Sequence, residues 1–151
     1  MIRIQFDRPP EFTVALIKPD AVDKSKAIFQ MIQKNGFEIA AHSTKKLTEE
    51  EARIFYHGQR DSPNFEEMVK HLSSGPVIAL FLKKRNAIVD WICLIGDSDP
   101  AKAAEGTIRK VFGKTIVKNA VHGSSSKADM LNEAYLSARW KIFFLSTRSC
   151  C

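Results

Sequence analysis

Runs of branched and aromatic apolar residues predict the strands of this chain. Residues 12–17 and 77–82 are almost continuously apolar, a pattern typical of strands buried on both faces of a sheet. Residues 37–40 alternate between apolar and polar positions and continue weakly to Leu47, which favours a half-buried strand. A shorter apolar run at residues 120–122 follows a long irregular stretch. The pattern therefore predicts four strands.

Between these runs the apolar residues recur every three or four positions, which predicts amphipathic helices. Thr48 and Glu51 have the spacing of a capping box, and we expect Asn86 to cap a later helix. Lys83, Lys84 and Arg85 are expected to form a solvated charge cluster at the end of a strand. The predicted helices span about residues 26–34, 49–56, 63–72, 87–95 and 126–135, with one helical turn at 107–112 in a long loop region.

The predicted order of elements is βαββαβ with inserted helices, which indicates an α+β fold of the ferredoxin-like type. A chain of 151 residues with 44% hydrophobic residues is long enough for one globular domain with a real core. We expect an N-terminal leader at residues 1–11, ended by two prolines, and the domain at residues 12–138. Residues 139–151 are expected to be a C-terminal tail that packs on the body or on a neighbouring subunit.

The formal net charge is +6, but the lysines and arginines are scattered among acidic residues. No dense basic stripe therefore indicates a specific nucleic-acid site. Three cysteines show neither metal-ligand spacing nor a disulfide framework, which favours a reducing, intracellular and cytoplasmic setting. No apolar run approaches the roughly 18 residues of a membrane span. The terminal Cys150-Cys151 pair lacks a prenylation pattern.

His122 and Lys18 are the first candidates for chemistry. His122 ends a short strand, and the Gly-Ser turn after it can start a helix whose free N–H groups attract an anion. A neutral imidazole is a competent nucleophile near pH 7. Lys18 ends a buried strand, where its ammonium could meet phosphate at the sheet rim. Taken alone, His122 fits a histidine satisfied by a backbone carbonyl better than a nucleophile, and Lys18 fits an ordinary solvated lysine equally well.

Four separated motifs, taken together in order, resemble the nucleoside diphosphate kinase family from about Phe12 to Tyr135. They are Lys18-Pro19-Asp20, Ser73-Ser74-Gly75-Pro76, Gly106-Thr107-Ile108-Arg109 and Asn119-Ala120-Val121-His122-Gly123-Ser124. The resemblance implies a four-stranded antiparallel sheet and a ping-pong reaction, in which phosphate passes from a nucleoside triphosphate such as ATP to a histidine and then to a nucleoside diphosphate. It also implies Mg²⁺ bound through the nucleotide phosphates, with no metal site of the protein's own, and a homo-oligomer, most often a hexamer.

The resemblance assigns the catalytic roles residue by residue. His122 matches the phosphorylated histidine, and Lys18 and Arg109 match the cations that hold the terminal phosphate. Glu133 matches the glutamate that orients the imidazole, and Ser124 matches its hydroxyl neighbour.

Further matches concern the surroundings of the nucleotide. Asn119 matches a residue that binds the sugar hydroxyl, and Tyr56 matches a tyrosine near the histidine. Ser125 replaces the aspartate that is common after the Gly-Ser pair.

Two departures from the family pattern bear on nucleotide affinity. Ile92 stands where an arginine is usual, although Ser98 keeps the hydroxyl of a threonine often found beyond it. Asn64 stands where a phenylalanine usually stacks on the base, which leaves Phe65 and Ile116 as the expected clamp. These changes predict a working kinase with a weakened grip on the nucleotide. The alternatives are a non-catalytic binding or assembly module of the same fold and, with less support, a nucleic-acid-binding domain.

Overall fold

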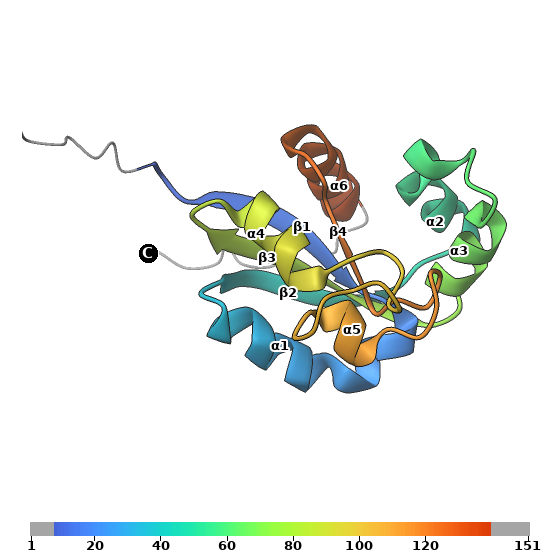
Figure 1. Ribbon diagram of the computed structural model, residues 1–151. Coiled ribbons are helices and arrows are strands. Elements are labelled where there is room, and N and C mark those ends of the chain that lie inside the picture. Colours follow the sequence, from blue (N-terminus) through green and yellow to red (C-terminus); the bar gives the residue numbers. More distant parts are fainter. Residues whose placement is uncertain (1–7, 140–151) are drawn as a thin grey trace, which may run out of the picture.

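The computed structural model describes residues 8–139, which form one four-stranded antiparallel sheet flanked by helices (Figure 1). The strand order is β2-β3-β1-β4, so β1 is central and pairs with both β3 and β4. This arrangement confirms the predicted ferredoxin-like α+β fold. The strands are β1 (Glu11–Ile17), β2 (Glu38–Lys46), β3 (Pro76–Lys84) and β4 (Val121–Gly123).

Six α-helices and two short 3₁₀ helices are found in the described part of the chain. Helices α2 and α3 form a hairpin that stands beside α6, whereas α1 and α5 lie together below the sheet in this view (Figure 1). The helices are η1 (Pro19–Lys24), α1 (Ser25–Lys34), α2 (Glu49–Phe55), η2 (His57–Gln59), α3 (Phe65–Leu72), α4 (Ala87–Ile95), α5 (Ile108–Phe112) and α6 (Lys127–Arg139).

The core is divided between the two faces of the sheet. On one face, Trp91 of α4 and Ile28 of α1 pack against strand residues such as Ala15 and Leu80. On the other face, the α2–α3 hairpin covers Leu16 and its neighbours. Because β1 is buried on both faces, its apolar run is continuous rather than alternating.

Helix α4 is capped differently from the expectation. Asn86 takes the N-cap position, but its backbone has a left-handed φ of 58° and its side chain makes no capping hydrogen bond. The carboxylate of Glu11 instead accepts a hydrogen bond from the Ile88 N–H at 3.0 Å. Asn86 is therefore the N-cap residue, as predicted, but its side chain does not cap the helix, because a carboxylate 77 residues from Ile88 accepts the hydrogen bond instead. Glu11 also belongs to β1 itself.

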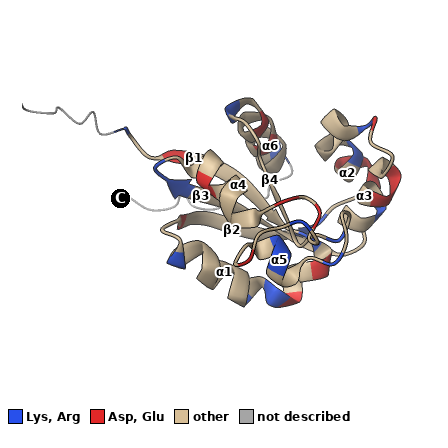
Figure 2. Cartoon of the chain, viewed as in Figure 1, with Lys and Arg blue, Asp and Glu red and all other residues tan. Residues whose placement is uncertain are grey.

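The predicted solvated cluster after β3 is also wrong for Lys84. Strand β3 extends through Lys84, whose Nζ lies 2.6 Å from Asp90 Oδ2 and 5.0 Å from the centroid of the Phe37 ring. The aliphatic stem is part-buried while the ammonium is paired, a common use of a long cationic side chain. Figure 2 shows basic and acidic residues interspersed along the ribbon.

Residues 97–118 form the expected long connection with one helical turn, α5, capped by the Thr107 hydroxyl. No helix within residues 8–139 is long and apolar enough to cross a membrane. Residues 1–7 of the expected leader lie outside the described residues, as do residues 140–151 of the expected tail, including Cys150 and Cys151.

Candidate active site

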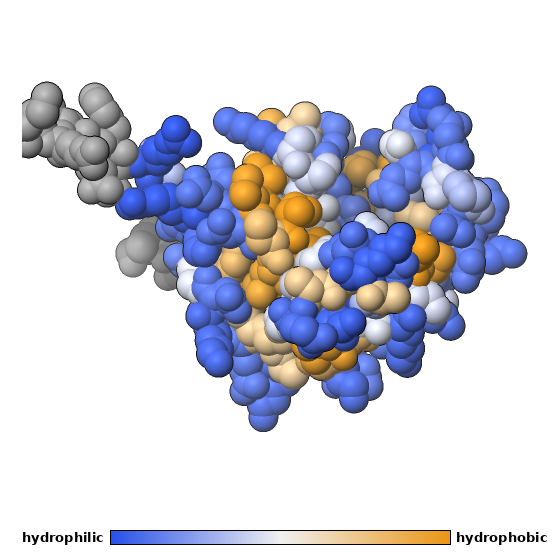
Figure 3. Space-filling model, viewed as in Figure 1, coloured by the Kyte–Doolittle hydropathy of each residue, from blue (hydrophilic) through white to orange (hydrophobic). Residues whose placement is uncertain are grey.

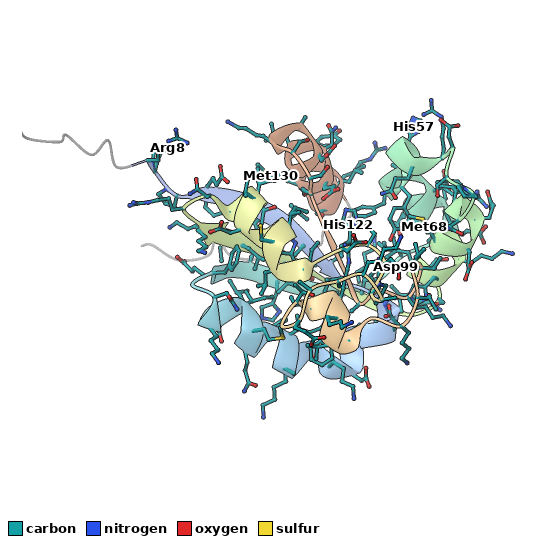
Figure 4. The ribbon with its side chains drawn as sticks, viewed as in Figure 1. Arg8, His57, Met68, Asp99, His122 and Met130 are labelled. Atoms are coloured by element: carbon teal, nitrogen blue, oxygen red, sulfur yellow. The ribbon has the colours of Figure 1, made fainter. Side chains whose placement is uncertain are left out.

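His122 lies where β4 ends, opposite Leu16 of the central strand. Its side chain faces a cavity of about 980 Å³ between the α2–η2 segment, α6 and the 97–118 connection. Figure 4 shows His122 in this space, between α6 and the hairpin that carries Met68. The imidazole is 15% exposed, so it is sheltered yet reachable from the cavity.

One nitrogen of the imidazole is already engaged. His122 Nε2 lies 2.9 Å from Glu133 Oε1, and the buried Ser124 hydroxyl donates a hydrogen bond to Glu133 Oε2 at 2.5 Å. An ionised carboxylate can only accept, so the bonded nitrogen carries the proton. Nδ1 is therefore the nitrogen with a free lone pair, and it is available to an incoming electrophile.

Local sequence explains why Glu133 reaches the histidine. The Ser126 hydroxyl accepts a hydrogen bond from the Asp129 N–H at 3.1 Å, which caps the first turn of α6 immediately after β4. Glu133 lies one turn beyond Asp129, on the buried side of the helix. Phe55 supports the ring from the other side, with its centroid 4.8 Å from that of the imidazole in an edge arrangement.

Lys18 is buried in the cavity wall rather than solvated at the sheet rim. Its Nζ donates hydrogen bonds of 2.7 Å to the Val117 carbonyl and to Asn119 Oδ1. Burial lowers the pKa of Lys18 to about 8, although the charge of Asp20 opposes this and that of Arg109 adds to it. Lys18 is therefore a cation near neutral pH that lies close to losing its proton.

Arg109, like Lys18, is held in place by hydrogen bonds to backbone carbonyls. Its Nη1 and Nη2 donate hydrogen bonds of 3.0 Å each to the carbonyls of Gly96 and Val121. Burial is the main cause that lowers the pKa of Arg109, but a guanidinium stays protonated in proteins. Its Nε has no hydrogen-bond partner among the described residues, so one buried donor of the guanidinium is unsatisfied.

Tyr56 also contacts the imidazole, with ring centroids 6.0 Å apart. Burial raises the pKa of Tyr56, so its hydroxyl is neutral at physiological pH. This hydroxyl has no hydrogen-bond partner within residues 8–139.

The structure brings most of the sequence-predicted site residues to one cavity. Asn119 also donates from Nδ2 to the Ser98 carbonyl at 2.9 Å, which ties the 97–118 connection to the start of β4. Ser124 lies behind Glu133 and is fully buried. The predicted residues that line the cavity are Lys18, Tyr56, Ser98, Arg109, Asn119, His122 and Glu133.

The two residues expected to clamp the base do not line this cavity in the described chain. Phe65 packs into the core beneath the α2–α3 hairpin, with the Arg53 guanidinium 5.9 Å from its ring centroid. Ile116 is 49% exposed on the 97–118 connection. Ile92, by contrast, does line the cavity, where the family pattern would place an arginine.

The contact between Phe55 and His122 was not predicted from the sequence. The run Ile54-Phe55-Tyr56 holds three consecutive large apolar residues on a short helix, and not all of them can face the sheet. The surplus of apolar residues in this run was the available signal that some of them face a site instead of the sheet. Ile54 and Phe55 both line the cavity.

Comparison with known proteins places this geometry in a family. Residues 11–142 match the family model described as nucleoside diphosphate kinase. The nucleoside diphosphate kinase of Geobacter sp. strain M21 is 44% identical over 118 residues, which cover 77% of this chain and 86% of the relative. That of Chlorobium luteolum is 41% identical over 126 residues, which cover 82% and 90%.

Solved structures show the same relationship. The Aquifex aeolicus nucleoside diphosphate kinase superposes with a TM-score of 0.78 at 37% identity, covering 84% of this chain and 94% of that one. The enzyme from Encephalitozoon cuniculi gives a TM-score of 0.82 at 30% identity, covering 90% and 94%. The chain therefore belongs to the nucleoside diphosphate kinase family.

Proposed function

We propose that this kinase moves the γ-phosphate of ATP, or of another nucleoside triphosphate, to a nucleoside diphosphate through a phosphohistidine on Nδ1 of His122. The observation that carries the proposal is the 2.9 Å contact between His122 Nε2 and Glu133. A carboxylate behind the ring fixes the tautomer and stabilises the positive charge that the imidazole gains when Nδ1 forms its bond to phosphorus. Ser124 keeps that carboxylate in place by donating to its second oxygen.

Lys18 and Arg109 are proposed to bind the terminal phosphate during transfer. Both cations lie on the cavity wall near His122, and their hydrogen bonds to backbone carbonyls hold them in position before substrate arrives. Preorganised charge of this kind stabilises the negative charge on the transferred group without reorganisation at the moment of reaction. Asn119 is proposed to bind a sugar hydroxyl, since its Oδ1 has a second lone pair beside the one that Lys18 uses.

Mg²⁺ is proposed to enter with the nucleotide. Within the described residues no group of three or more His, Cys, Asp or Glu side chains could hold a metal ion. The cavity wall does carry single oxygen donors such as Asp97 and Ser98, which suit an ion that takes most of its ligands from phosphate and water. When bound, Mg²⁺ neutralises phosphate charge and orients the phosphates.

The grip on the nucleotide is proposed to be weaker than in relatives with the full family pattern. The apolar Ile92 side chain on the cavity wall cannot donate to phosphate. A charge-assisted hydrogen bond lost in this way weakens affinity by roughly 10- to 150-fold. Phe65 and Ile116 remain the proposed base clamp and would reach the base only at the edge of the cavity, because neither contributes to its wall.

A homo-oligomer, most simply a hexamer, is proposed for the assembled protein, in an intracellular, cytoplasmic setting. Large apolar side chains are exposed on the surface, including Val89, which is 63% exposed, and Val111, which is 56% exposed. Figure 3 shows exposed hydrophobic surface over the α4 region. Light scattering after size-exclusion chromatography gives the number of subunits.

The decisive experiment follows the phosphate. Protein is mixed with γ-labelled ATP and Mg²⁺, and we expect acid-labile, base-stable label that moves onto added GDP. His122→Ala should remove the label. His57→Ala is the matched control, because His57 is a second histidine on the cavity wall and its loss should leave labelling intact. Label that survives in His122→Ala would refute the proposal, and a folded, nucleotide-binding wild type without label would favour a binding module.

A further inference from the structure

A buried acid–histidine pair lies just behind the site, outside the cavity wall. His71 Nε2 of α3 is 2.8 Å from Asp20 Oδ1 of η1, and the two side chains are only 9% and 4% exposed. Neither residue lines the cavity, so neither can touch the nucleotide there. Burial alone would raise the pKa of Asp20, but the hydrogen bond and charge of His71, together with Lys18 and a backbone N–H, bring it below the usual value. Asp20 is therefore a carboxylate in an interior that disfavours unpaired charge.

The other oxygen of Asp20 holds a strained backbone. Ala120, which is fully buried, has a left-handed φ of 73°. This conformation costs an L-residue with a Cβ roughly 1–2 kcal/mol and persists only where the surroundings impose it. Asp20 Oδ2 accepts a hydrogen bond of 3.0 Å from the Ala120 N–H, and the Ala120 carbonyl accepts one of 2.8 Å from the Lys18 N–H. Both polar groups of Ala120 are thus fixed by the segment that follows β1.

The strained residue decides where the reactive groups point. Ala120 stands between Asn119, which bonds to Lys18, and Val121, which leads to His122. A rotation at Ala120 would therefore move Asn119 and His122 relative to one another. Hydrogen bonds run from α3 through His71 and Asp20 to Ala120, and so connect the hairpin on one side of the cavity with the strand that carries the nucleophile.

We propose that His71 and Asp20 are positioning residues for phosphoryl transfer: His71 fixes the Asp20 carboxylate, and Asp20 holds Ala120 in the left-handed conformation that aims His122 at the phosphate. The inference rests on the role proposed for His122 as nucleophile. It assigns to a pair outside the cavity wall an effect on the chemical step and little effect on binding. A misplacement of about 1 Å in a reacting group can slow transfer by about 100-fold.

The test varies His71 and keeps the Asp20 side chain. His71→Met removes the donor at similar volume, and His71→Asn keeps a polar group that is too short to bridge to Asp20. His71→Gln places an amide donor near the position of Nε2 and should restore the tie. Val69→Ala is the matched control, because it removes buried packing from the same helix without touching the pair.

Two quantities are measured on the full chain: the rate of His122 phosphorylation at saturating MgATP, and the dissociation constant of adenosine 5′-(β,γ-imido)triphosphate. We expect His71→Met and His71→Asn to slow phosphorylation by about 10- to 100-fold, with analogue binding within about threefold of wild type. His71→Gln and Val69→Ala should stay within about threefold of wild type in both. An unchanged rate in His71→Met, an equal loss in His71→Gln or Val69→Ala, or a matching loss of analogue binding would overturn the proposal.

Amide hydrogen exchange at Ala120 tests this inference independently of the proposed role of His122 as nucleophile. Wild type that gains no label on His122 refutes the proposed function, whatever the His71 variants do. The link from His71 through Asp20 to Ala120 is then judged by exchange alone. At least tenfold faster exchange of the Ala120 amide in His71→Met, but not in His71→Gln, supports this link. Equal exchange in wild type and both variants overturns it.

Discussion

Lys18 should control the alkaline limit of activity. With a pKa of about 8 in the free protein, about half of the molecules carry the ammonium at pH 8 and about one tenth at pH 9. If only the charged form binds the terminal phosphate productively, kcat/KM for ATP falls about tenfold per pH unit above 8, because this parameter reports the free enzyme. The assay is a coupled measurement with GDP as acceptor and excess Mg²⁺ from pH 6.5 to 9.5.

The same group makes an independent prediction about stability. The pKa of Lys18 is lower in the fold than its ordinary value of 10.5, so below pH 8 the protein bears the full cost of burying the charge. Between pH 8 and 10.5 the unfolded chain binds more protons than the folded one, so stability rises with pH. The difference between a pKa of about 8 in the fold and 10.5 in the unfolded chain corresponds to about 3 kcal/mol in the free energy of unfolding.

Lys18→Gln separates Lys18 from every other group that titrates in this range. The variant should have low kcat/KM at every pH without the alkaline decline, and it should lack the gain in stability between pH 8 and 10.5. Urea denaturation of both proteins across that range gives the difference. A wild-type profile that stays flat to pH 9.5, or a decline that persists in Lys18→Gln, would refute the reasoning.

Three further changes test the site. Glu133→Gln removes the charge behind His122 and should slow phosphorylation by about 10- to 100-fold in rapid-quench experiments; an unchanged rate would contradict the orienting role. Ile92→Arg adds a phosphate donor to the cavity wall and should lower KM for ATP about tenfold or more with little change in kcat; an unchanged KM would show that residue 92 does not reach the phosphates. Gly123→Ala places a Cβ against the indole of Trp91 and should destabilise the fold by about 1–3 kcal/mol in urea denaturation; a loss below about 0.5 kcal/mol would show that the ring yields freely.

The sequence predicted helices and strands correctly where their formation depends on residues close together in the chain. The capping box at the start of α2 forms as expected, with Thr48 and Glu51 bonded to each other's backbone N–H groups. The apolar run of β1 predicted a strand buried on both faces because nothing distant is needed to recognise it.

Contacts between residues far apart in the chain could not be predicted from the sequence in the same way. Lys18 was predicted as a cation near phosphate, but its burial depends on Val117 and Asn119, about 100 residues later. Asp20 and His71 are ordinary polar residues in the sequence and become a buried pair only when α3 packs against η1. The expected roles of the site residues came from the resemblance to the family, whereas their protonation and orientation depend on the tertiary structure.

The capping of α4 by Glu11 has a practical consequence for trimming the chain. A fragment that starts at Phe12 keeps almost all of β1 but loses the acceptor for the Ile88 N–H, at a cost of about 1 kcal/mol. Ile88 is followed on α4 by Trp91 and Ile92, one in the core and one on the cavity wall. A cut at the amino end, far along the chain from the nucleophile, would therefore loosen a helix that forms part of the nucleotide cavity.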